Sequence, residues 1–101
     1  MKKEQEQFEI ETLKHIRNRL DYIYSVSKSY NNDNPELMDT IASLAIVANM
    51  FAKIKLEELN GQKIETSSPQ GFIVRNLATS YSRMKEYEKQ KEDIVIPTWK
   101  L

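Results

Sequence analysis

Apolar residues recur every three or four positions along three stretches of the chain, and this spacing predicts three α-helices. We expect the first helix over about residues 4–30, the second over about 35–59 and the third over about 76–91. One apolar stripe of the first helix is formed by Leu13, Ile16, Leu20, Ile23 and Val26. The pattern therefore predicts a mostly α fold.

Polar residues mark both ends of the second helix. Residues 31–34 read Asn-Asn-Asp-Asn, and their short side chains compete with the backbone for hydrogen bonds, which favours a turn. Asn34 is expected to cap the helix, with Pro35 at the first position, where its missing N–H costs nothing. Gly61 can adopt the left-handed conformation that closes a helix. Because the turn is short, the first two helices are expected to form an antiparallel hairpin.

The second helix is apolar on two sides, and such a helix must be covered on two sides. The side that carries Leu44, Ala48 and Phe51 is expected to pack on the first helix. Its partners there are expected to be Leu13, Leu20 and Ile23. The other side is expected to be an interface between copies of the chain, and it consists of Ile46, Val47, Met50 and Ile54.

A small β-hairpin is expected over residues 62–74, between the second and third helices. Lys63 to Thr66 alternate polar and apolar residues, and Phe72 to Val74 are aromatic or β-branched. The segment between them, Ser-Ser-Pro-Gln-Gly, has the composition of a turn. The predicted organisation is a single helical domain over residues 1–93, followed by an apolar tail at 94–101.

Composition excludes several classes of function. The length of 101 residues fits one domain. No Cys and a single His leave no disulfide, no thiolate nucleophile and no His-rich metal site. His15 lies on a charged helix face, and no Gly-rich phosphate-binding motif is present. We therefore expect a non-enzymatic protein with no metal, no cofactor and no small-molecule substrate.

No segment is expected to enter a membrane. The first residues lack the uninterrupted apolar run of a signal peptide. The most apolar stretch, Ile41–Ile54, is shorter than the roughly 20 residues that cross a bilayer. A cytoplasmic protein is therefore expected.

Basic residues are distributed unevenly, although fifteen Lys and Arg balance fifteen Asp and Glu in the whole chain. Residues 12–30 carry four basic residues against one acidic residue, and residues 71–91 carry five against two. Helices with such an excess can present stripes of positive charge to the phosphates of DNA. The candidate DNA-binding residues are Lys14, Arg17, Arg75 and Arg83. The alternative is that these side chains belong to ordinary solvated helix faces.

The segment from Met38 to Lys89 resembles the core of the small terminase subunits of tailed bacteriophages. An acidic residue precedes a helix with a Leu-Ala pair, an aromatic residue and a basic residue. A Gly, a Thr-containing link and a Gly-aromatic pair follow, and then a helix with basic residues and Met. The matching positions are Asp39, Leu44, Ala45, Phe51, Lys53, Gly61, Thr66, Ser67, Gly71, Phe72, Ala78, Tyr81, Met84 and Lys85. The chain departs from the family pattern at residues 75–77, where members often have Asn-Pro, and in its short ending at 95–98.

This resemblance implies a ring-forming subunit that binds double-stranded phage DNA and regulates the ATPase and nuclease of the large terminase subunit in the infected bacterial cell. The alternative is a helical protein-protein adaptor or antitoxin-like module with no DNA role. The apolar tail is expected to dock on another protein, either the large terminase subunit or a neighbouring copy. Folding back onto its own chain is the alternative for the tail. The residues expected to dock are Ile94, Ile96, Trp99 and Leu101.

Overall fold

The computed structural model describes residues 7–61 and 68–94, with side chains described as far as Lys91. In order along the chain, its elements are α1 (Ile10–Ser29), a 3-10 turn η1 (Asn31–Asp33), α2 (Pro35–Leu59) and α3 (Pro69–Ile94). The mostly α character predicted from the sequence is present.

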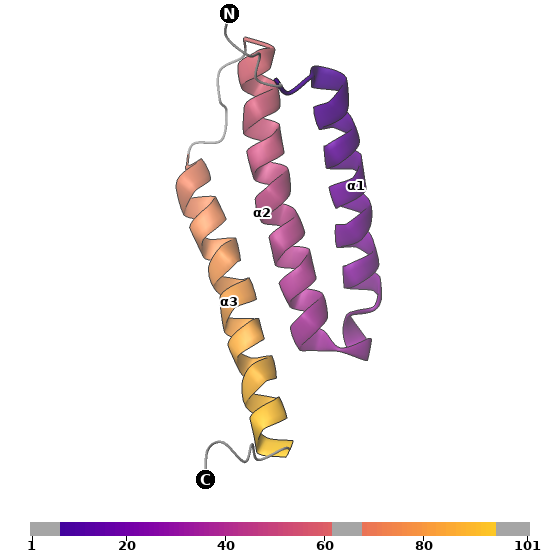
Figure 1. The fold of residues 1–101 in the computed structure, drawn as a ribbon, viewed down its shortest axis with the longest axis vertical. Coiled ribbons are helices and arrows are strands. Elements are labelled where there is room, and N and C mark those ends of the chain that lie inside the picture. Colours follow the sequence, from indigo (N-terminus) through magenta and orange to yellow (C-terminus); the bar gives the residue numbers. More distant parts are fainter. Residues whose placement is uncertain (1–6, 62–67, 95–101) are drawn as a thin grey trace, which may run out of the picture.

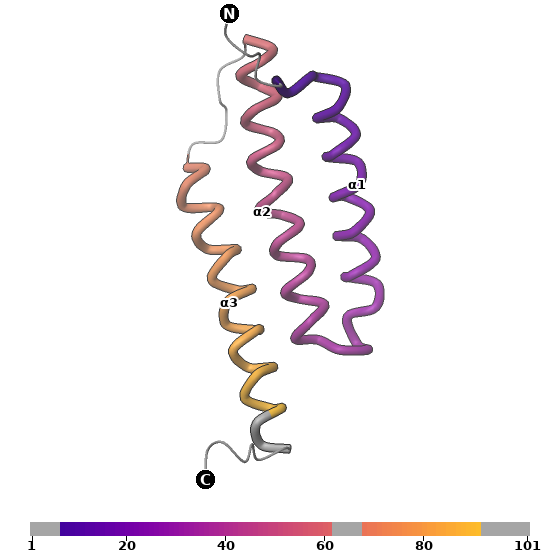
Figure 2. The backbone as a smooth tube through the Cα atoms, viewed as in Figure 1, coloured from indigo at the N-terminus to yellow at the C-terminus, as the bar shows by residue number. Residues whose placement is uncertain are grey.

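The three helices lie in a single layer with α2 in the middle (Figure 1). Each helix runs antiparallel to its neighbour, as the backbone trace also shows (Figure 2). Both outer helices pack on α2, but no Cα atom of α1 lies within 8 Å of α3 in the described part of the chain. The radius of gyration is 18.0 Å, compared with about 13 Å for a compact domain of this length. The molecule is therefore an open layer with two broad faces, not a closed bundle.

The ends of α1 and α2 follow from local chemistry. α2 has the bounds that its sequence pattern predicts, and the Asn34 side chain accepts a hydrogen bond from the backbone N–H of Leu37 at 3.3 Å. α1 starts at Ile10, later than the predicted start, and Glu9 at its N-terminus makes no capping hydrogen bond through its side chain. The predicted helix start at residue 4 lies outside the described residues.

The predicted β-hairpin over residues 62–74 is wrong for the part that the structure describes. Phe72 to Val74, expected to form a strand, lie in the first turns of α3. Pro69 occupies the start of this helix, where its fixed φ is suitable, and the N–H of Phe72 donates to the carbonyl of Ser68 at 3.0 Å. Strand propensity depends strongly on context, and here packing against α2 selects the helix. The rest of the expected hairpin, residues 62–67, lies outside the described residues.

The seams between the helices are filled mainly by small side chains, which let helix backbones approach closely. The buried residues of α2 are Thr40, Ala42, Ser43, Ala45, Val47 and Ala52. The buried residues of the outer helices are Leu13, Ser27 and Ser80. No large side chain in the described part of the chain is fully buried. Apart from Leu13 and Val47, the large apolar residues whose side chains the structure describes are half-buried or exposed.

α2 is also long and apolar enough to cross a membrane, judged by length and composition alone. An 18-residue window within it has a mean hydropathy of 1.5, and 28% of that window is buried. A central helix that contacts a neighbour on each side has the same composition, because both sides must be apolar. The position of α2 between α1 and α3 accounts for the apolar residues at its two seams, whereas Ile41, Leu44 and Phe51 are exposed.

Candidate functional site

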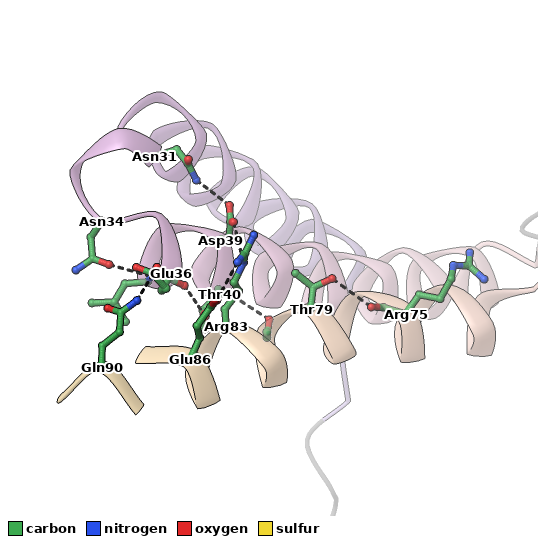
Figure 3. Close-up of polar contacts among 12 residues, drawn as sticks. Asn31, Asn34, Glu36, Asp39, Thr40, Arg75, Thr79, Arg83, Glu86 and Gln90 are labelled. Carbon is green, nitrogen blue, oxygen red and sulfur yellow. Dashed lines mark hydrogen bonds and ion pairs between the residues drawn. The ribbon is translucent and has the colours of Figure 1, made fainter. Parts of the chain in front are cut away.

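Asp39 on α2 connects the turn after α1 with α3 (Figure 3). Its carboxylate accepts a hydrogen bond from the Asn31 amide at 2.7 Å and pairs with Arg83 Nε at 3.1 Å. Arg83 Nη1 pairs in addition with Glu86 at 3.0 Å. The hydrogen bond to Glu86 and the charge of Asp39 raise the pKa of Arg83 above its ordinary value. Arg83 is therefore a charged group that is already held by two carboxylates.

Two further hydrogen bonds set the register of α3 along α2. The buried hydroxyl of Ser80 donates to the carbonyl oxygen of Thr40 at 3.1 Å. One end of the seam is closed by the Gln90 amide, which donates to Glu36 at 3.1 Å (Figure 3). These contacts join residues 40 and 54 positions apart in the sequence, and no local pattern predicts such pairs.

A polar chain links α1 with α2 on one face of the layer. Arg17 Nε donates to the Asn49 side-chain oxygen at 2.5 Å, and the Asn49 amide donates to Asp21 at 2.8 Å. These residues border a cleft of about 340 Å³ that also includes Ile46, Met50 and Phe72. We call it the Asn49 cleft. Asn49 interrupts the most apolar stretch of the sequence, and that interruption was the signal by which this cleft could have been found.

The four candidate DNA-binding residues are not brought together. Lys14 and Arg75 are exposed, but they lie on α1 and α3, which are separated by α2. Lys14 is 3.8 Å from Glu11. Arg17 and Arg83 are engaged with side chains of α2. In the described part of one copy, these four residues therefore form no continuous basic stripe, and Lys14 and Arg75 lie on separate edges.

The predicted roles of the two sides of α2 are not those that the structure shows. Leu44 and Phe51, expected to pack on α1, are 45% and 59% exposed, and Ala48 is exposed as well. Ile23, one of their expected partners, is also exposed, whereas Leu13 is buried. α1 packs instead beside the small residues of α2. The expected burial of Phe51 is thus wrong.

The four residues predicted as an oligomer interface do not form one open surface. Val47 is buried within the layer. Ile46 and Met50 line the Asn49 cleft. Ile54 is half-buried and lines a second hollow of about 450 Å³, which Phe8 and Phe51 also border.

In the described part of α2 and α3, eight large apolar residues are exposed, and six of them share one side of the layer, which we call the Leu44 face. The six are Ile41, Leu44, Phe51, Leu77, Tyr81 and Met84. The spacing within each helix is three, four or seven residues, so the members of each helix share one side. None of the six is charged.

The members from α2 and α3 lie on the same side of the layer. On α3, Ser80 points at α2. Phe72, which lines the Asn49 cleft, and Arg83, which pairs with Asp39, both lie on one side of Ser80 around the helix. Leu77 and Met84 are three residues before and four after Ser80, which places them on its other side. On α2, Leu44 is two residues from Ile46, and Phe51 is two residues from Asn49, and both Ile46 and Asn49 line the cleft. Two residues correspond to about 200° around a helix. Both sets therefore lie opposite the Asn49 cleft.

Other candidate groups are also placed by the structure. His15 is exposed on α1, and the described residues include no cluster of three or more His, Cys, Asp or Glu able to hold a metal ion. Ile94 ends α3. The remaining docking residues of the tail, Ile96, Trp99 and Leu101, lie outside the described residues, so their predicted role stays a prediction.

We compared the chain with protein-family models, with curated proteins and with solved structures, and none of the three comparisons found a match.

Proposed function

We propose that this chain is a non-enzymatic assembly subunit that works as a homo-oligomer, binds double-stranded DNA and regulates a packaging motor, as the small terminase subunits that it resembles do. The supporting observation is the placement of apolar residues. Most of the buried residues are small, while six large exposed apolar residues form the Leu44 face. A patch of this kind on a soluble protein marks an interaction site.

The proposed DNA contacts come from the basic edges of several copies. One copy has Lys14 on α1 and Arg75 on α3, too far apart in the layer to form one stripe. Repeating such edges around an oligomer multiplies weak contacts through avidity. Arg17 and Arg83 contribute less in this proposal, because each already has a partner on α2.

DNA binding is tested by fluorescence anisotropy with a labelled DNA duplex over a range of salt concentrations. We expect the affinity to fall steeply with salt. Lys14→Ala and Arg75→Ala should each weaken binding. The slope of the logarithm of the binding constant against the logarithm of salt concentration should become shallower by about one for each phosphate contact that is lost. Lys55→Ala is the control and should change binding less, because Lys55 lies on α2 and is 3.8 Å from Glu58. Absence of binding at low salt would contradict the DNA role.

The alternative function is a helical adaptor that binds protein and no DNA. The separation of the basic residues in one copy favours it. An oligomer that fails to bind duplex DNA, and whose addition leaves the ATPase rate of a large terminase subunit unchanged, would decide for the adaptor.

A further inference from the structure

We propose that a second copy of this chain covers the Leu44 face, so that two open layers stack face to face into a two-layered, six-helix unit. This inference rests on the proposed homo-oligomer and names the surface on which its copies meet. It replaces the side of α2 that the sequence pattern predicts, at Ile46 and Met50, with the opposite side.

The size of the Leu44 face fits an interface between proteins. About half of each of its six large side chains is exposed. With about 200 Å² for a large apolar residue, the six expose on the order of 600 Å². One partner of a stable interface buries about 800 Å² in total, and somewhat more than half of that area is apolar. The face thus supplies the apolar area that one partner of a stable interface buries, before the area of any polar rim is counted.

The incomplete core of one copy points to protein as the occupant. A single helical layer has no second layer to cover it, and domains bury their apolar surface between at least two layers. A second copy supplies the missing layer without any other component.

Charge favours a copy of the same chain over a lipid surface or a nucleic acid. The six residues of the Leu44 face are uncharged, and the chain has no net charge. Two identical copies can therefore approach without repulsion. An anionic membrane or a phosphate backbone would attract a surface rich in Lys and Arg. Beside this face, Lys85 Nζ lies 5.7 Å from the centre of the Tyr81 ring, and Lys55 borders the hollow together with Glu58.

The shape of the face also suits a partner of the same kind. The hollow of about 450 Å³ beside Phe51, bordered by Ile16 of α1 and by Phe8 just before α1, is a mainly apolar recess that can receive a large side chain. Ala48, which is exposed between Leu44 and Phe51, has a short side chain and so forms a shallow depression on the surface of α2. Protruding and recessed apolar groups on one surface are what a self-complementary, two-fold contact requires.

The inference is tested by measuring molar mass with light scattering during size-exclusion chromatography. Tyr81→Glu is the test variant, and Tyr22→Glu is its matched control. The two tyrosines are 66% and 70% exposed. Tyr22 lies about half a turn around α1 from buried Leu13, on the outer edge of the layer. We expect the wild-type mass to be an even multiple of 11.9 kDa, to fall for Tyr81→Glu and to stay unchanged for Tyr22→Glu.

Two further variants keep the test decisive. Leu44→Glu at the centre of the face should also lower the mass, whereas Ile46→Glu in the Asn49 cleft should not. Circular dichroism must show wild-type helicity in each variant that is compared. An oligomer that survives both Tyr81→Glu and Leu44→Glu but dissociates with Ile46→Glu would overturn the inference and assign the contact to the cleft side.

The outcomes separate this inference from the proposed function. An oligomer that dissociates as expected but does not bind duplex DNA would leave the inference standing and contradict the DNA role. A wild-type chain that is monomeric at tens of micromolar would contradict both. A monomer that binds phosphatidylglycerol vesicles through Leu44 would give the face to lipid and overturn the inference.

Discussion

Single side chains decide where the helices of this protein begin and how closely they approach. Asn34 and Pro35 begin α2 through a capping hydrogen bond and a pre-set φ. These effects act within four residues, so they can be recognised in the sequence. Ser80 acts over a longer separation in the sequence. Its small side chain lets α3 approach α2 closely at Thr40.

Replacing Ser80 by Leu is expected to lower the free energy of unfolding by about 1–3 kcal/mol, since the larger side chain does not fit the seam. The substitution also removes the hydrogen bond to Thr40. Urea denaturation followed by circular dichroism measures the change. Ser82→Leu is the control, because Ser82 is exposed, and substitutions at such sites stay within about 0.5 kcal/mol. Equal effects of the two substitutions would show that the α2–α3 seam is not packed as described.

At the scale of elements, the two glycines have opposite roles. Gly61 follows α2 with a φ of +73°, a conformation that other residues adopt only at a cost. Gly71 lies inside α3, where glycine is a poor helix former. The same residue type therefore ends one helix and weakens another.

We expect Gly61→Ala to destabilise the protein by about 1 kcal/mol, because alanine is strained at this positive φ. No steric clash adds to this cost, since nothing lies within 4 Å of the added Cβ. Gly71→Ala should instead stabilise the protein by up to about 1 kcal/mol. The new Cβ would come within 2.8 Å of Ser68 Oγ, the end of an exposed side chain that can rotate away. Thermal unfolding of both variants tests the pair, and a loss of stability in Gly71→Ala would show that Ser68 is held in place.

For the whole molecule, an open layer makes stability depend on assembly. If copies cover the Leu44 face, native protein is stabilised by association, and its apparent stability depends on concentration. The thermal midpoint of the wild type should therefore rise when protein concentration is raised a hundredfold. Tyr81→Glu should have a lower midpoint that depends less on concentration. A wild-type midpoint independent of concentration would mean that one layer is stable alone.

Features that depend on neighbouring residues could be predicted from the sequence. The bounds of α2, the turn at residues 31–34 and the helical spacing of apolar residues in α1 and α2 follow from caps, propensities and periodicity. The same local reasoning failed at Phe72 to Val74, because strand propensity there is weaker than a helix start at Pro69 that is packed on α2.

Which side of α2 is covered depends on how the three helices pack, and the sequence pattern did not predict it. α2 is apolar around most of its circumference, so periodicity alone cannot tell a seam from an open face. The small residues Ala42 and Ala45 admit a close neighbour, whereas Leu44 and Phe51 remain outside. Asp39 and Arg83 are 44 positions apart, and only the packing of α3 brings them together. Contacts between helices join residues that are far apart in the sequence, so a pattern of neighbouring residues cannot predict them.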